Sequence, residues 1–510
     1  MQSVSQNNTR IAKNTLALYI RQIIVMCIQL FTFRIVLQAL GITDYGIQNV
    51  VGGAVVMFSF LTSTLQSVTQ RFINVEMEKG SKDTLQKIFS TSLMLHIVIG
   101  VIIIFLGETA GLWFVENKLV IPEERTLAAM WVFQFALFGM FLSIISAPFT
   151  ALVIAHEDMH VYGYVGIFEV IMKLAAVYLL ITMNTDKLIT YSALVFFISC
   201  FVTLFYNIYC QRKYSEAKFS FHYDRSVIKE LGGYSGYIFV DKILYMLIVQ
   251  GVNILLNMFY GPAVNAARGV AYAVDNALLS FGLNFRKALD PQLTKSCARG
   301  DRVYMWSLLE RGTRISYFLI LIFAVPILLK AEFILQLWLK DIPEYTVAFT
   351  QLVIIYALLE ATFTLLSTIV RATGKLKAFY SVHYVYMALT LVFSYAVCEM
   401  GYPPHYVFIV PLPLLLLSIP ARFIVMKKLA NFSVKFFTQK ALLPMFAVSV
   451  ISFVPFYAAN RLLTESNLHS FGIMALSMLW TGAVILYIGL RKSERAIAFD
   501  FVKRKFLQKP

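Results

Sequence analysis

The stretch Ile97–Leu106, which reads Ile-Val-Ile-Gly-Val-Ile-Ile-Ile-Phe-Leu, decides the class of fold. It lies inside a longer window with few charges, and Ala128–Ile145 and Leu412–Ile419 lie in similar windows. A helix needs about 20 such residues to cross a hydrocarbon core about 30 Å thick. Strands of an outer-membrane barrel would instead alternate polar and apolar residues over about ten positions. That alternation is absent from the sequence, which therefore predicts membrane-spanning helices.

The composition of the whole chain agrees with this interpretation. Of its 510 residues, 59% are hydrophobic and only 14% are charged, whereas about 25% of the residues in soluble domains are charged. A soluble protein of this length could not bury so much apolar surface. We predict an all-α polytopic membrane protein with fourteen spans. The predicted spans lie near residues 14–39, 47–68, 88–108, 127–150, 161–183, 188–209, 232–258, 264–285, 315–329, 347–370, 379–399, 407–426, 441–459 and 470–490.

Lysine and arginine are distributed unevenly between the two sides of these spans. Thirty-two of them fall in the N-terminus, the loops on the same side and the C-terminal tail, and fewer than ten fall in the opposite loops. Cytoplasmic loops carry such an excess, so both termini are predicted to be cytoplasmic. The net charge of +16 is therefore a sign of topology and does not indicate a nucleic-acid partner.

Glycine turns recur at a constant offset along the chain. Gly41 and Gly80 follow the first two predicted spans, and Gly261 and Gly300 follow the seventh and eighth at the same offset from them. The tripeptide Ile121-Pro122-Glu123 likewise matches Ile342-Pro343-Glu344. This order of matches predicts an internal duplication.

The duplication predicts three parts of the chain. Residues 1–215 would form an N-terminal lobe of six helices and residues 216–430 a C-terminal lobe of six, followed by two helices and a basic cytoplasmic tail in 431–510. Because six is even, both lobes enter the membrane from the same side, and a pseudo-two-fold axis along the membrane normal would relate them. Transporters built from parallel repeats bind substrate near the repeat interface and alternate access by rocking.

Ionisable residues inside a span cost at least about 2.5–3.5 kcal/mol each on insertion scales and need a physical reason. Glu169 and Lys173 are four positions apart on one helical face and can neutralise each other. Arg34 lies close enough to the outer end of its span for its side chain to reach the surface. Seven residues are candidates for charges that line a substrate cavity: Arg21, Arg34, Lys173, Asp241, Lys242, Asp275 and Glu360.

The deeper charges leave alternatives open. Arg21 and Asp241 are separated by the same offset as the paired glycines, so the repeat puts them at one depth, either as cavity groups or as a salt bridge between lobes. Asp275 and Glu360 lie near the middle of their spans, without a neutralising neighbour on the same helix. Each is a candidate proton carrier or partner for a cavity cation, and a simple buried ion pair is an equal alternative for Glu360.

Motifs for catalysis or for a cofactor are missing from the sequence. The segment His156–His160 contains two histidines and two acids, but it occupies a short predicted cytoplasmic loop with no further ligand motif, which favours a solvated turn over a metal site. There is no HExxH motif, no glycine-rich phosphate loop and no Ser/His/Asp arrangement. The five cysteines are scattered and form no disulfide or metal framework. We therefore predict a protein that is not an enzyme and that has neither metal nor cofactor.

Several motifs in fixed order resemble a known family. They are an arginine-bearing first span, Leu40–Gly46, Gly52-Gly53, Ala147-Pro148, Pro291, Leu337–Leu339 and Pro343–Thr346. Over nearly the whole chain this pattern is similar to the polysaccharide-transporter branch of the multidrug/oligosaccharidyl-lipid/polysaccharide (MOP) exporter superfamily. It resembles the Wzx-type O-antigen flippases in particular.

The resemblance implies a two-lobed flippase that carries an undecaprenyl-diphosphate-linked oligosaccharide to the outer leaflet of the inner membrane. Its substrate would be a repeat unit of O-antigen, capsule or exopolysaccharide, and its partners would be membrane lipids, a polysaccharide polymerase and chain-length machinery. In such proteins cavity cations accept the diphosphate and acidic sugars. Arg21, Arg34, Lys242 and Lys173 occupy helices that would supply them, and arginine offers oxyanions a planar fork of donors.

Two other functions fit the sequence less well. Cation-coupled multidrug exporters of the same superfamily carry an essential aspartate in the first helix, and the span 14–39 contains no acidic residue. A membrane polysaccharide polymerase or ligase generally uses a long outward-facing loop for its chemistry, and the sequence predicts none. Both comparisons favour the flippase.

Overall fold

The computed structural model describes residues 2–79, 82–156, 158–219, 236–373, 376–430, 432–462, 466–492 and 494–495. For some helical residues, 2–25 and 236–243 among them, it describes the backbone alone. All regular elements within these ranges are helical. The chain divides into two compact units. The N-terminal unit comprises residues 1–269 and 390–404, and the C-terminal unit comprises 270–389 and 405–510. The predicted lobe boundaries at residues 215 and 430 stay a prediction.

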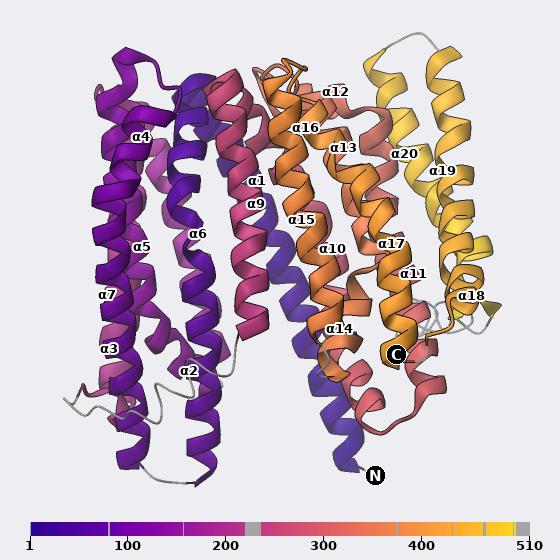
Figure 1. Ribbon diagram of the computed structural model, residues 1–510, viewed down its shortest axis with the longest axis horizontal. Coiled ribbons are helices and arrows are strands. Elements are labelled where there is room, and N and C mark those ends of the chain that lie inside the picture. The colour runs from indigo at the N-terminus through magenta and orange to yellow at the C-terminus, as the bar shows by residue number, and fades with distance from the viewer. Residues whose placement is uncertain are drawn as a thin grey trace, which may run out of the picture. The chain divides into compact units, whose positions relative to one another are not determined.

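The N-terminal unit is built mainly from long upright helices (Figure 1). Its helices are α1 (Gln2–Val56), α2 (Ser59–Lys79), α3 (Lys82–Leu106), α4 (Leu112–Lys118), α5 (Thr126–Ala155), α6 (Met159–Thr182), α7 (Lys187–Lys213), α9 (Gly236–Tyr260) and the first turns of α10 (Pro262–Ala298). A π-helical turn at Gly107–Gly111 and 3₁₀ turns at Glu123–Arg125 and Ser215–Ala217 connect some of them. Helix α5 is central, because α1, α2, α3 and α7 all pack against it.

The C-terminal unit also consists of helices. They are the rest of α10, α11 (Arg302–Leu329), α12 (Ala331–Trp338), α13 (Thr346–Ala361), α14 (Thr364–Thr373), most of α15 (Leu376–Glu399), α16 (Tyr406–Ile409), α17 (Pro411–Ala430), α18 (Val434–Phe437), α19 (Leu443–Leu462) and α20 (Asn467–Val484). Two π-helical turns, Thr438–Leu442 and Ile485–Gly489, flank α19 and α20. Helix α11 is the centre of this unit, packing against α13, α19 and α20.

Eleven helical segments of the described chain are long and apolar enough to cross a membrane, which confirms a multi-pass membrane protein. They are Met26–Val56, Asp83–Lys118, Glu123–Ala155, His160–Thr182, Lys187–Lys213, Arg302–Leu329, Thr346–Val370, Ala378–Glu399, Tyr406–Lys428, Val434–Arg461 and Asn467–Gly489. Met246–Tyr260 is a shorter apolar helix. The remaining predicted spans overlap α2 and α10, which are helical but less apolar.

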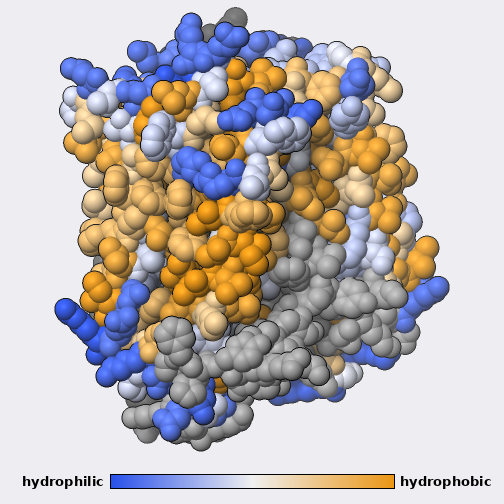
Figure 2. Space-filling model, turned by 60° about the vertical axis from the view of Figure 1, so that its left-hand side comes forward, coloured by the Kyte–Doolittle hydropathy of each residue, from blue (hydrophilic) through white to orange (hydrophobic). Residues whose placement is uncertain are grey.

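Apolar side chains face outward as well as inward. Phe105, Leu127, Phe197 and Leu417 are more than half exposed, and on the face shown in Figure 2 hydrophobic residues form a broad belt with hydrophilic residues gathered above and below it. Water would penalise such a surface, whereas lipid tails would not, so the belt fits a bilayer.

The two glycines of the predicted repeat have the same backbone conformation. Gly41 interrupts α1, and Gly261 separates α9 from α10; φ is 80° at both residues. This left-handed region costs little for glycine and is unfavourable for residues with a Cβ atom. The constant offset in the sequence therefore reflects one helix–glycine–helix turn that occurs twice.

Helix α11 begins earlier than the sequence predicts. The predicted span starts at residue 315, but the helix starts at Arg302 and includes Glu310 and Arg314. Hydropathy places these charges in a loop, whereas the structure buries both and pairs them with each other at 3.1 Å. A charge that is neutralised within the helix does not end it.

Candidate substrate cavity

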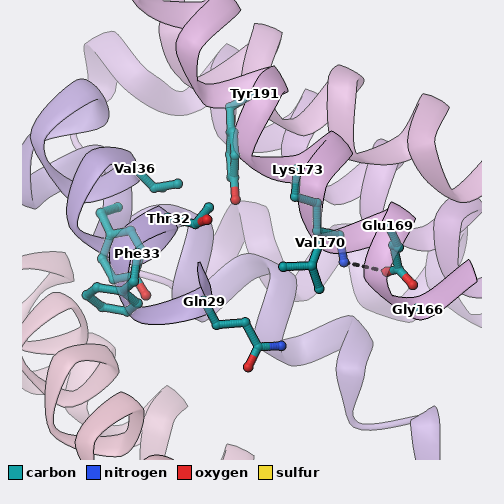
Figure 3. Close-up of a pocket in the computed structure, with 10 residues that line it drawn as sticks. Gln29, Thr32, Phe33, Val36, Gly166, Glu169, Val170, Lys173 and Tyr191 are labelled. Carbon is teal, nitrogen blue, oxygen red and sulfur yellow. Dashed lines mark hydrogen bonds and ion pairs between the residues drawn. The ribbon is translucent and has the colours of Figure 1, made fainter. Parts of the chain in front are cut away.

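A cavity of about 410 Å³ lies between α1, α6 and α7 in the N-terminal unit (Figure 3). The hydroxyls of Thr32 and Tyr191 point into its centre, and Gln29 lies below them. As their spacing predicts, Lys173 donates to a Glu169 carboxylate oxygen at 2.6 Å, with both side chains about one-third exposed. Lys173 therefore lines a cavity, but its charge is neutralised there.

A larger cavity of about 600 Å³ adjoins the first, and Tyr45 and Tyr191 line both. Helices α1, α2, α5, α7, α9 and α10 contribute to its wall. Its polar lining consists of amides, hydroxyls and one guanidinium: Gln48, Asn49, Ser59, Ser143, Ser192, Ser199, Gln250, Asn253 and Arg268. Aromatic rings of Phe135 and Phe196 complete it. None of its described lining residues carries a carboxylate.

Hydrogen bonds hold the amides of this wall in place. The Asn253 Nδ2 donates to the backbone oxygen of Asn49 at 3.2 Å, and Asn265 donates to the Oδ1 of Asn253 at 2.8 Å. Ser192 donates to the Gln48 Oε1 at 2.8 Å. Gly53 leaves room for these amides, since a Cβ there would lie 2.8 Å from the Gln250 Oε1. The wall is thus a preorganised set of donors and acceptors within an apolar bundle.

Arg268 and the amides were not predicted from the sequence. Arg268 is only 4% exposed and donates to the backbone oxygen of Val249 at 2.7 Å. It lies within a predicted span, so the rule that intramembrane charges need a reason applies to it as well. The amides Gln250 and Asn253 are polar groups in an apolar helix, and extending the same rule from charges to amides would have found them.

Other predicted site residues have different surroundings. Arg34 is partly buried on α1 and is not among the lining residues of either cavity. The side chains of Arg21, Asp241 and Lys242 lie outside the described residues. Their predicted place in a cavity therefore stays a prediction.

Asp275 and Glu360 come together in the C-terminal unit. Glu360 lies within electrostatic range of Asp275 and also of Arg286 and Arg422. Asp275, Arg286 and Arg422 are each less than 9% exposed. If Glu360 forms a simple ion pair, its basic neighbours are therefore Arg286 and Arg422. Neither was among the predicted site residues, and hydropathy places Arg286 in a loop.

Polar and aromatic groups extend this cluster. An Arg422 guanidinium nitrogen lies 3.1 Å from the Nδ1 of His383, and the guanidinium stacks 5.9 Å above the Tyr386 ring. Tyr386 in turn donates to the Tyr356 hydroxyl at 3.0 Å. The cluster is a buried network of charges and hydroxyls within the C-terminal unit.

The segment His156–His160, which has the composition of a metal site, instead connects its loop to the end of α7. His156 bonds to Glu216 at 2.6 Å and stacks on Tyr214, and Asp158 accepts hydrogen bonds from Lys213 and from Tyr214. Burial raises the pKa of Asp158, but the hydrogen bonds from Lys213, Tyr214 and Tyr209 and the charge of Lys213 together outweigh burial and leave the pKa below its ordinary value. The described residues contain no group of three or more possible metal ligands. The turn is therefore anchored by specific contacts and is not merely solvated as predicted.

Comparisons with known proteins agree with this architecture. A family model described as polysaccharide biosynthesis protein matches residues 11–295, more than half of the chain. The search of curated proteins gave no match.

Three solved structures show the fold. A lipid II flippase, MurJ, in an inward closed conformation shares 12% identity and covers 93% of this chain and 100% of its own, with a TM-score of 0.68. An inward-facing multidrug resistance MATE family transporter of the MOP superfamily shares 12% identity and covers 81% of this chain and 99% of its own, with a TM-score of 0.66. A MOP superfamily transporter from Pyrococcus furiosus, described as having a binding pocket of reverse polarity, shares 12% identity over 82% of this chain and 96% of its own, with a TM-score of 0.55. The chain is therefore a member of the polysaccharide biosynthesis protein family and has the fold of the MOP-superfamily transporters.

Proposed function

We propose that this protein moves an undecaprenyl-diphosphate-linked oligosaccharide, a repeat unit of O-antigen, capsule or exopolysaccharide, across the bacterial inner membrane by alternating access. The observation that carries the proposal is the wall of the larger cavity, with its amides, hydroxyls and aromatic rings. Amide side chains both donate and accept hydrogen bonds, as sugar hydroxyls do. Membership in a polysaccharide biosynthesis family supports the same substrate class.

The charges of the two N-terminal cavities argue against a cationic drug as the substrate. The larger cavity has no carboxylate among its described lining residues, and the Glu169 carboxylate of the smaller one is neutralised by Lys173. A cation entering this low-dielectric space would find no free counter-charge among the described lining residues. Arg268 brings a guanidinium to this wall, a donor group that suits a diphosphate or an acidic sugar.

The short outer connections argue against a polymerase or ligase. Leu119–Pro122, Met183–Asp186 and Leu339–Tyr345 join helices at the end of the bundle predicted to face outward. Such short loops offer little room for a catalytic site. Transport by the helical body itself is the better-supported function.

A flipping assay in proteoliposomes tests the proposal. Gln250→Leu keeps the side-chain volume and removes one amide from the cavity wall, so flipping of a fluorescent lipid-linked oligosaccharide should fall about three- to tenfold. The matched control is Gln38→Leu, an exposed amide of α1 that lines neither cavity and should leave the rate unchanged. Equal rates in all three proteins, or uptake of a cationic drug in place of the glycolipid, would contradict the proposal.

Arg21 is proposed as a further cavity cation that accepts the diphosphate or acidic sugars. Losing one charge-assisted contact typically weakens binding about ten- to a hundredfold, so Arg21→Ala should impair glycan export at normal protein abundance. Arg21→Lys should retain part of the activity. If Arg21→Ala fails but adding Asp241→Ala restores export, the two residues form a structural salt bridge instead.

A further inference from the structure

A separate polar cavity of about 460 Å³ lies in the C-terminal unit. Its lining residues come from the ends of α11 and α19, the starts of α13 and α20, and the short helix α12. Figure 1 shows α12 at the same end of this unit as the end of α19 and the start of α20. Both connections involved, after α11 and after α19, belong to the side that the charge distribution predicts to face outward.

Lys330 is the unusual member of this lining. It is only 7% exposed, yet no described residue forms a hydrogen bond or ion pair with its ammonium group. A lysine at a helix end often caps free carbonyls. Here Gln351 and Asn460 donate to the last carbonyls of α11, those of Leu328 and Leu329, at 3.2 and 3.5 Å. The ammonium is therefore available for another partner.

The rest of the cavity favours negative charge. Ser466, Asn467 and Ser470, which cap and begin α20, line it, and the first turn of an 18-residue helix carries a partial positive charge. Glu332 is the acidic residue of the lining; it is exposed and accepts a hydrogen bond from Gln336 at 3.3 Å. Solvent screens its charge more than that of the buried ammonium.

We propose that this cavity binds an oxyanion, a phosphate or carboxylate group, with Lys330 as its counter-charge and the first turn of α20 as a second source of positive potential. The Lys330 side chain is largely buried and its ammonium opens into the cavity, where an oxyanion would accept charge-assisted hydrogen bonds from it. The same chemistry occurs in the headgroup of an anionic phospholipid and in a free anion. The site is separate from the N-terminal cavities and does not depend on the proposed transport function.

Thermal unfolding of the full-length protein in nanodiscs provides the test. One arm titrates inorganic phosphate at constant ionic strength into phosphatidylcholine discs, and the other replaces phosphatidylcholine stepwise with phosphatidylglycerol. We expect saturable stabilisation in at least one arm: in the first for a soluble anion, in the second for a lipid headgroup. Lys330→Met should weaken the effective affinity about ten- to a hundredfold, whereas Lys340→Gln, which removes an exposed charge from the same connection, should leave it unchanged.

The Met variant also separates ligand binding from a structural role. Without any anion, Lys330→Met should be at least as stable as the wild type, because it replaces a largely buried lysine that has no ionic partner by an apolar chain of similar length. Lys330→Arg keeps the charge and should keep the anion response. The proposal is overturned if neither arm stabilises the wild type, if Lys330→Met responds like Lys340→Gln, or if Lys330→Met is less stable than the wild type in anion-free neutral discs.

Discussion

At the scale of single residues, the backbone of Gly46 lies against that of Pro262. A Cβ atom added at Gly46 would lie 1.9 Å from the carbonyl oxygen of Pro262, far inside contact distance. Gly46 follows the turn at Gly41, and Pro262 follows the equivalent turn at Gly261. The two copies of the repeated turn therefore touch through a residue that must lack a side chain.

Gly46→Ala should destabilise the protein by about 1–3 kcal/mol or more, because backbone and not a flexible side chain opposes the new methyl group. Thermal unfolding in detergent measures the change. Gly472→Ala is the matched control, since nothing lies within 4 Å of its Cβ position, and a helical glycine usually gains from the substitution. Equal melting temperatures for the wild type and Gly46→Ala would refute the role of this contact.

The sequence predicted the turn glycines, but it predicted neither the contact of Gly46 nor the cavity amides. The turn glycines were visible because one constant offset repeats in the sequence. The contact of Gly46 with Pro262 was not, because the two residues are far apart along the chain. A rule confined to ionisable groups does not predict the cavity amides, although amides inside a membrane also need hydrogen-bond partners.

At the scale of elements, an ion-pair network attaches the segment after α20 to α11. Glu494 binds Arg311 at 2.9 Å and Arg314 at 2.7 Å, while Arg491 binds Glu310 at 2.6 Å. Glu310, Arg314 and Glu494 are at most 5% exposed at the side chain. Each buried charge of the network has an opposite partner, so the loss of one member would leave another charge buried without compensation.

Removing one member should be costly. Glu494→Gln leaves Arg314 without full neutralisation and should lower the free energy of unfolding by about 3–5 kcal/mol, the usual effect of breaking a buried pair. Denaturation in micelles, with Glu124→Gln as an exposed control, measures it. An equal loss in both variants would mean that the network does not hold the segment.

The contact between the loop at Asp158 and the end of α7 should depend on pH. The pKa of Asp158 is lowered in the folded protein, since its hydrogen bonds and the charge of Lys213 together outweigh the opposing effect of burial. A carboxyl of this kind stabilises the fold above its unfolded pKa of about 3.9 and loses that contribution as pH falls through its lower folded pKa. The protection factors of the amides around residues 156–158, which compare exchange with its intrinsic rate at the same pH, should therefore fall below about pH 4.

Asp158→Asn provides the control for this pH effect. The variant should exchange faster than the wild type at pH 7, because Lys213 loses its ionic partner, and its exchange should show less additional opening in acid. Identical acid profiles in the two proteins would assign the effect to another group.

Element boundaries were harder to predict than element number. Hydropathy places the start of α11 at residue 315 because Glu310, Arg311 and Arg314 look like loop charges. Their partners Arg491 and Glu494 lie near the other end of the chain, and only the folded unit brings them together. The pair Glu169 and Lys173 was predictable, since both partners lie on one helix.

At the scale of the whole molecule, the charge bias predicts that both termini are cytoplasmic. Alkaline phosphatase, which is active outside the cytoplasm, should be active when fused after Trp113 or Trp338 and inactive when fused after Arg299. Fluorescent-protein fusions at the same sites should give the reverse pattern. An active fusion after Arg299 would invert the predicted topology, although the helical fold itself would stand.

Hydropathy predicted the class of this molecule because the membrane constrains every span in the same way. It could not predict the cavities, whose walls combine residues from helices distant in sequence, such as Gln48, Ser192 and Asn253. Polar side chains of this kind show their role only when several helices meet. Side chains that act alone, or within one helical turn, are the ones that sequence patterns identify.

The modest hydropathy of α2 has a consequence for how the chain is made. This helix is not among the segments apolar enough to cross a membrane by themselves, so its transfer from the translocon into lipid is unfavourable while it is alone. In the finished protein it packs against α3 and α5, and Ile73 is fully buried. Since α5 is synthesised after α2, we expect α2 to wait at the translocon until its partners emerge, so that biogenesis of the N-terminal unit proceeds by delayed, grouped insertion.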